Sequence, residues 1–278
     1  MNNKLRTYKA FTLIELLVAM GILAMVLSFA SVIFRVCIDS HRTAIANAEI
    51  MQKLRAITDQ LNDDFKAVIG TYRNRLDFQT RNVNSDSIVF FANGDFQSVR
   101  QYEYLKPNGT NALKTVSGNV ASIYYGQAAD PYPNVDPNTD PFKGEPKQKL
   151  LVRRQTILTS YSDGLFKTQS NPLGEFYISS LSKSYVDPNL DVDALIVRPS
   201  LDPHLEQDLP MYMAKGVDNF TIEWFDGNIN SSQIQWQRSI VGSSNIFPKA
   251  LKFTFTLYDS KGIIKEGRTF THIVYLDD

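Results

Sequence analysis

The sequence predicts an α+β protein in which a long N-terminal helix packs on a mostly antiparallel β-sheet body. Two patterns predict this class. The N-terminal part keeps apolar residues at helical spacing and has no Gly or Pro between Gly21 and Gly70. From Ser87 onward, short runs rich in β-branched and aromatic residues alternate with clusters of Gly, Pro, Asn and Asp, as strands and turns do.

Composition favours a folded body without global charge. The chain has 278 residues, of which 43% are hydrophobic, and this is enough apolar surface for a packed core. Its 29 basic and 29 acidic residues cancel, so no overall field attracts nucleic acid, and no nucleic-acid partner is expected. Cys37 is the only cysteine, which excludes an intrachain disulfide and a dithiol redox pair.

A membrane-spanning helix is predicted near the N-terminus. Residues Leu16 to Phe34 form a run of nineteen positions without a charge, about 28 Å long as a helix, which matches a bilayer core of about 30 Å. Basic residues precede this run at Lys4, Arg6 and Lys9, and the next one is Arg35. The positive-inside pattern therefore predicts a cytoplasmic N-terminus and a body on the other side of the membrane.

Three kinds of segment fit this run: a secretory signal with a small-x-small site at Ser28–Ala30, a plain signal anchor, or a prepilin-type signal. Glu15 favours the third, because a carboxylate costs about 2 to 3 kcal/mol near the bilayer centre and an ordinary anchor has no use for it. Cleavage after Ala10 would create an α-amine on Phe11, four residues before Glu15. A neighbouring copy could then present its amine to that carboxylate and neutralise both charges.

The segment KAFTLIELLVAMGILAMV resembles the cleavage and N-methylation motif of type IV prepilins and type II secretion pseudopilins. The resemblance implies that a prepilin peptidase cuts between Ala10 and Phe11 and methylates the Phe11 amine, and that Glu15 serves assembly. Ala10 stands where the family usually has Gly. The implied organisation is a leader at 1–10, a transmembrane helix at 11–38, an amphipathic continuation at 39–70 and a periplasmic body at 71–278, anchored in the bacterial inner membrane.

Helical spacing continues beyond the membrane segment. It predicts one helix from about Phe11 to about Val68, with Gly70 as its stop. The apolar positions of its second half lie three or four residues apart and are Leu54, Ile57 or Thr58, Leu61, Phe65 and Val68.

The same spacing assigns an outward, charged face to this second half. Arg55 can meet Asp59 one helical turn on, and Asp63 and Asp64 follow on the same face. Two interpretations stay open: a solvated surface, or charges that set the register between neighbouring subunits in a fibre.

The body is predicted to be a set of short antiparallel strands. The runs SIVFFA and FQSVRQYEYL are separated by Asn93-Gly94-Asp95, which predicts a hairpin turn. Near the end, residues 217–226 alternate Phe220, Ile222 and Trp224 with polar positions, so one face should be buried. Further strands are predicted in VASIYYG, QKLLVRRQTIL, KALKFTFTLYD and RTFTHIVYL.

The order of these runs, with MAKGVDNFTIEWFDGN before the terminal pair, is similar to that of J-type minor pseudopilins, and W-type minor pilins share part of it. The resemblance implies a structural subunit that helps initiate or cap a type II secretion pseudopilus. Its implied partners are other pilins or pseudopilins, the prepilin peptidase, the inner-membrane assembly platform and the lipid bilayer. The alternatives are a minor pilin of a type IV pilus, serving adhesion, motility or DNA uptake, and a membrane-tethered binding module or enzyme.

Candidates for chemistry are few, and no cofactor is expected. The proline-rich stretch 130–146 offers Asp130, Asp136 and Asp140 as calcium candidates, but it lacks the Gly and terminal Glu of an EF-hand loop. Cys37 and His41 lie one helical turn apart, and two ligands do not make a metal site. His204 and His272 lie far along the chain, and no serine sits in a G-x-S-x-G elbow.

Aromatic residues of the body allow two interpretations. They could form an exposed stacking surface, or they could fill the core of the sheet, which the alternating periodicity favours. The residues concerned are Trp224, Trp236, Tyr102, Tyr104, Tyr124, Tyr125 and Tyr212.

Overall fold

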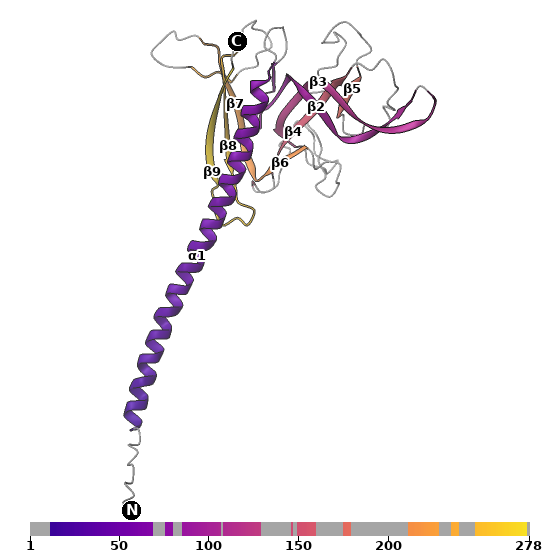
Figure 1. Ribbon diagram of the computed structural model, residues 1–278. Helices are drawn as coiled ribbons and strands as arrows, with labels where there is room; N and C mark the ends of the chain where they lie inside the picture. Colours follow the sequence, from indigo (N-terminus) through magenta and orange to yellow (C-terminus); the bar gives the residue numbers. More distant parts are fainter. Residues whose placement is uncertain are drawn as a thin grey trace, which may run out of the picture. The chain divides into compact units, whose positions relative to one another are not determined.

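The computed structural model describes residues 12–68, 76–79, 85–106, 108–128, 146, 149–159, 175–178, 211–227, 235–238 and 248–276. The chain divides into two compact units, Met1–Ala48 and Glu49–Asp278. Its described elements are one long helix and antiparallel β-sheets, so the predicted α+β, pilin-like arrangement is confirmed (Figure 1).

Helix α1 (Leu13–Lys66) runs through both units. Its predicted extent is nearly right, but the helix ends at Lys66, because Val68 already forms a β-bridge with Ala92. In the first unit every large apolar side chain from Leu13 to Ile38 is at least 51% exposed, so this part of α1 presents apolar groups on all sides. Such a helix suits a lipid surrounding rather than water.

The first sheet of the second unit has six strands in the order β1-β2-β3-β4-β5, with β6 paired to β4 (Figure 1). All its pairings are antiparallel except β4 with β5. The strands are β1 (Leu76–Gln79), β2 (Ser87–Leu105), β3 (Asn111–Gln127), β4 (Leu150–Thr159), β5 (Phe176–Ile178) and β6 (Tyr212–Lys215).

The hairpin predicted at Asn93-Gly94-Asp95 is wrong. Strand β2 continues through these residues, and its register with β3 shifts between Asn93 and Phe96, which is a β-bulge. The chain instead reverses at Lys106–Thr110, where the Lys106 N–H donates to the Thr110 carbonyl at 2.9 Å and Gly109 has a φ of 80°. A tertiary contact explains the difference, because the Asn93 N–H donates to the Ala67 carbonyl at 2.8 Å and holds the bulge against the helix end.

The second sheet consists of β7 (Val217–Phe225), β8 (Ala250–Leu257) and β9 (Arg268–Tyr275), all antiparallel. The predicted alternation is confirmed. From Phe220 along β7, and from Leu251 along β8, every second side chain is buried by 95% or more: Phe220, Ile222, Trp224, Leu251, Phe253, Phe255 and Leu257.

The core of the second unit forms where α1 meets both sheets. Ile50, Ile57 and Leu61 are fully buried, and Phe65 stacks on Phe90 of β2 at 4.2 Å between ring centroids. Phe65 also lies 5.5 Å from the ring of Phe253 on β8. Each such side chain stabilises the fold by about 1.5 to 3 kcal/mol through burial, so the second half of α1 is the common packing element of the body.

The prediction of an outward, charged face is wrong at one position, Asp64. Asp64 is only 7% exposed and points into the body, whereas Arg55, Asp59 and Asp63 are exposed as predicted. No ion pair joins Arg55 to Asp59 in the described part of the chain. The prediction that aromatic residues fill the core is confirmed for Trp224, Tyr102, Tyr124 and Tyr125, while Tyr212 is 38% exposed.

Candidate assembly site

The first turn of α1 is held by three reciprocal hydrogen bonds between Thr12 and Glu15. The Thr12 N–H and the Thr12 hydroxyl both donate to Glu15 Oε2 at 2.9 Å, and the Glu15 N–H donates to Thr12 Oγ1 at 3.3 Å. This is a capping box, in which a threonine and a glutamate three positions later satisfy N–H groups that a helix start otherwise leaves open.

The capping box gives Glu15 a local role that the sequence argument missed, although the T-x-x-E spacing was there to read. Both side-chain contacts go to Oε2, so Oε1 accepts no hydrogen bond from the described residues. A carboxylate has about four acceptor positions, and this one keeps room for a further donor. Its neighbours Leu16 and Leu17 are 59% and 66% exposed, so the acid sits among lipid-type side chains.

The other predicted processing residues, Ala10 and Phe11, lie outside the described residues, and so do the calcium candidates Asp130, Asp136 and Asp140. Within the described part of the chain, no cluster of three or more His, Cys, Asp or Glu side chains could hold a metal ion. Cleavage, N-methylation and calcium binding therefore stay predictions from the sequence.

A second polar site joins the end of α1 to the six-stranded sheet. Asp64 accepts hydrogen bonds from Arg153 Nε at 2.6 Å and Nη2 at 2.8 Å, and from the Tyr125 hydroxyl. Gln60, one turn earlier, donates to Asp64 Oδ1 at 3.1 Å. Burial raises the pKa of the Tyr125 hydroxyl, and the adjacent Asp64 carboxylate raises it further, so this group stays a neutral donor.

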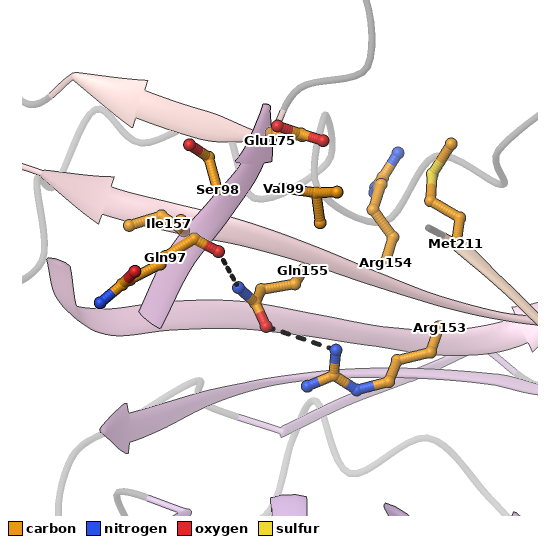
Figure 2. Close-up of a pocket in the computed structure, with 9 residues that line it drawn as sticks. All are labelled: Gln97, Ser98, Val99, Arg153, Arg154, Gln155, Ile157, Glu175 and Met211. Atoms are coloured by element: carbon orange, nitrogen blue, oxygen red, sulfur yellow. Dashed lines mark hydrogen bonds between the residues drawn. The ribbon is translucent and has the colours of Figure 1, made fainter. Parts of the chain in front are cut away.

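The described residues also enclose a small pocket of about 140 Å³ between β2, β4 and the residues preceding β5 and β6 (Figure 2). Gln155 is part of the pocket lining. Its side-chain amide donates to the Gln97 carbonyl, and its side-chain oxygen accepts from Arg153 Nη1. Among the described residues of its lining, Ser98 supplies the only hydroxyl, which accepts the Val116 N–H at 2.9 Å and donates to the Arg100 carbonyl at 2.6 Å. Ser98 thus fixes a bulge of β2 and is not paired with a catalytic base.

The described histidines are separate from one another and from this pocket. His41 is exposed on α1. His272 on β9 lies 2.9 Å from the Asn62 amide oxygen of α1. Among the described residues, neither forms a hydrogen bond with a serine or cysteine, so they make no nucleophile–base pair there.

Among the described residues, one helix, α1, is both long enough and apolar enough to cross a membrane. A single membrane-anchor helix that continues into an α+β body of antiparallel sheets defines a pilin-like arrangement. Residues 5–31 match the family model described as the prokaryotic N-terminal methylation motif, and this range contains Thr12 and Glu15. The motif indicates a type IV pilin- or pseudopilin-like protein, a class of structural subunits that a prepilin peptidase processes and that interact with other pilins. Comparison with curated proteins and with solved structures finds no match.

Proposed function

We propose that the chain is a minor pseudopilin, a structural subunit that helps initiate or cap a type II secretion pseudopilus. The observation that carries the assembly role is Glu15, a carboxylate retained among exposed apolar side chains and with one oxygen that accepts no hydrogen bond from the described residues. The J-like order of the strand motifs supports the choice of a secretion pseudopilus. An isolated charge in lipid is costly, and it is tolerated where it has a partner.

The proposed partner of Glu15 is the N-terminal amine of a neighbouring subunit. The prepilin peptidase removes residues 1–10 and methylates the new amine of Phe11, which keeps its positive charge. That amine then approaches Glu15 Oε1 of the neighbour, while Thr12 continues to hold Oε2. Pairing turns two costly isolated charges in the bilayer into one neutral contact and so favours docking of the incoming subunit.

The proposed location is the bacterial inner membrane, with the N-terminus cytoplasmic and the body periplasmic. Lys4, Arg6 and Lys9 support this orientation, because basic residues are retained on the cytoplasmic side. From there the inner-membrane assembly platform would move the subunit into the pseudopilus together with major and other minor subunits.

The retained acid also bears on which minor subunit this is. The K-type subunit at the extreme tip generally lacks the glutamate, whereas this chain has Glu15. Together with the J-like order of the strand motifs, this favours a minor subunit other than the extreme tip.

A minor pilin of a type IV pilus is the immediate alternative, since the same anchor serves both systems. Neighbouring genes separate the two: a secretion ATPase and secretin without a retraction motor favour secretion, and a retraction motor favours a type IV pilus. A membrane-tethered enzyme or binding module would instead act alone on a substrate or glycan.

Two variants of Glu15 test the proposal in cells with an active secretion or pilus system. Glu15→Gln keeps an oxygen that can cap Thr12 but removes the charge, whereas Glu15→Ala removes both. We expect both variants to insert in the membrane and to be lost from sheared fibres and from pull-downs of other minor subunits. Normal incorporation of Glu15→Gln would show that only the cap matters and would overturn the proposed charge pairing. Mass spectrometry of the mature protein should show N-methyl-Phe11, and a chain starting at Met1 or Ser31 would contradict the proposal.

A further inference from the structure

The start of the body-bound part of α1 is held by the turn between β8 and β9. Glu49 Oε1 accepts the Ser260 N–H at 2.9 Å, and Oε2 accepts the Ser260 hydroxyl at 3.0 Å. One turn along the helix, Lys53 Nζ donates to the Tyr258 carbonyl at 2.8 Å and pairs with Glu49 Oε1 at 2.8 Å. We name Glu49, Lys53, Tyr258 and Ser260 the helix clasp.

The turn that carries the clasp is rigidly built. Asp259 is 1% exposed, and its two carboxylate oxygens accept the N–H groups of Ile263 and Ile264, each at 2.9 Å. Gly262 and Gly267 both have a φ of 66°, which suits glycine. A side chain at Gly267 would approach the Leu257 carbonyl to 2.9 Å, so the chain can close this tightly only with glycine there. The acceptors and donors offered to the helix are therefore held by contacts within the turn itself.

The turn is also tied to the sheets of the body. The Tyr258 N–H donates to the Gly216 carbonyl at 2.8 Å, in the connection between β6 and β7. A force on the clasp is thereby passed to strands of both sheets, because β6 pairs with β4 and β7 pairs with β8.

The clasp provides the first polar attachments between α1 and the rest of the second unit. This unit starts at Glu49, and the next residue, Ile50, is fully buried. The other polar attachments of α1 come later, at Asn62 with His272 and at Asp64 with Arg153. Asn62 lies nine positions after Lys53, about 13 Å along the helix, and among the described residues no side chain of α1 between these two forms a hydrogen bond or ion pair with a strand.

This order matters when tension acts on the anchor. When a helix is fixed at its start, a force along its axis is shared by all of its contacts with the body at the same time. A helix free at its start can bend or unwind away from the body, so its contacts break one after another and each carries the full load. Local opening of this kind begins where attachments are fewest.

We propose that the helix clasp is a mechanical latch, which keeps α1 from peeling off the body when the membrane anchor is pulled. The inference rests on the proposed function, since a fibre subunit must be drawn out of the bilayer by force passing through this junction. It assigns Glu49 and Ser260 a role in bearing load that is separate from their contribution to resting stability.

The single cysteine allows a direct test with the full chain in detergent micelles. Cys37 is exposed and lies twelve residues before Glu49, so it accepts a pulling handle on the anchor side, and a C-terminal tag takes the second handle. At a fixed load we expect Glu49→Ala to raise the rate of the first extension event about tenfold or more, because hydrogen bonds to a charged group are lost. Ser260→Ala loses one of the two serine bonds and should give an intermediate rate.

Asn62→Ala is the matched control. It removes the hydrogen bond to His272 on the same helix, but beyond the clasp, so it should lower thermal stability without changing the rate of the first extension. Equal first-extension rates in wild type, Glu49→Ala and Ser260→Ala would overturn the inference, and so would an equal rise in Asn62→Ala. Because the measurement uses purified protein, its outcome is independent of whether the chain enters a fibre.

Discussion

The Asp64 carboxylate of α1 and the Arg153 guanidinium of β4 form a two-bond contact, at 2.6 Å and 2.8 Å, between residues 89 positions apart. Asp64 is 7% exposed, so the pair is largely removed from water. We expect Asp64→Ala to lower the free energy of unfolding of the body by about 3 to 5 kcal/mol, because it leaves a buried arginine without its counter-charge. Denaturant unfolding of the full chain in detergent would measure this loss.

Asp63 provides the control for this prediction. Its ion pair with Lys66 is 71% and 75% exposed at the two side chains, and such surface pairs contribute little. Asp63→Ala should therefore leave the unfolding midpoint unchanged. Equal effects of Asp63→Ala and Asp64→Ala would contradict the assigned importance of the buried pair.

The capping box at Thr12 gives a prediction about the start of the anchor helix. Thr12→Val removes the side-chain oxygen that accepts the Glu15 N–H, at a typical cost of about 1 kcal/mol for a lost helix cap. Amide hydrogen exchange of the first turn in micelles should become faster in this variant. Thr12→Ser keeps the oxygen and should behave as wild type, and fast exchange in both would count against the cap.

His272 predicts a pH dependence of stability. Burial lowers the pKa of its imidazole from the ordinary value of 6.5, although Asp59 acts in the opposite direction. The folded state therefore binds the proton more weakly than the unfolded state, so this contribution is complete above the unfolded pKa and falls as pH drops below about 6.5. Thermal unfolding between about pH 5 and 8 should show the fall, and His272→Gln, which does not titrate, should flatten it.

Gly118 of β3 predicts a packing effect. A side-chain carbon there would lie 2.6 Å from the Leu158 carbonyl oxygen and 2.7 Å from Ile157 Cγ2, so the neighbouring strand would have to move. Gly118→Ala should cost about 1 to 3 kcal/mol of folding free energy. Gly94→Ala meets only the Phe96 ring at 3.3 Å and should be milder, and the difference between their melting temperatures checks the prediction.

Periodicity was enough to predict the long helix and the strands of the second sheet. Ile57, Leu61 and Phe65 repeat every four residues, and Phe253 and Phe255 alternate with threonines, so each element carries its own signal. The methylation motif is equally local, because it lies within one continuous segment.

The errors came from contacts that are distant in the sequence. Asn93-Gly94 fits a bulge as well as a turn, and the hydrogen bond from Asn93 to Ala67 selected the bulge. Asp64 lies at the flank of the apolar stripe, and only the position of Arg153 in the fold explains its burial. The helix clasp likewise joins Glu49 to Ser260 across 211 positions, a pairing for which no short-range pattern exists.

The sharing of Phe65 between the rings of Phe90 and Phe253 has a practical consequence for anyone preparing this protein without its lipid anchor. A truncation that discards the whole of α1 would expose the apolar faces of both sheets to water, and these exposed faces would favour aggregation. A recombinant fragment intended for crystallisation should therefore begin just upstream of Glu49, which keeps the half of α1 that packs on both sheets and still omits the apolar run from Leu16 to Phe34.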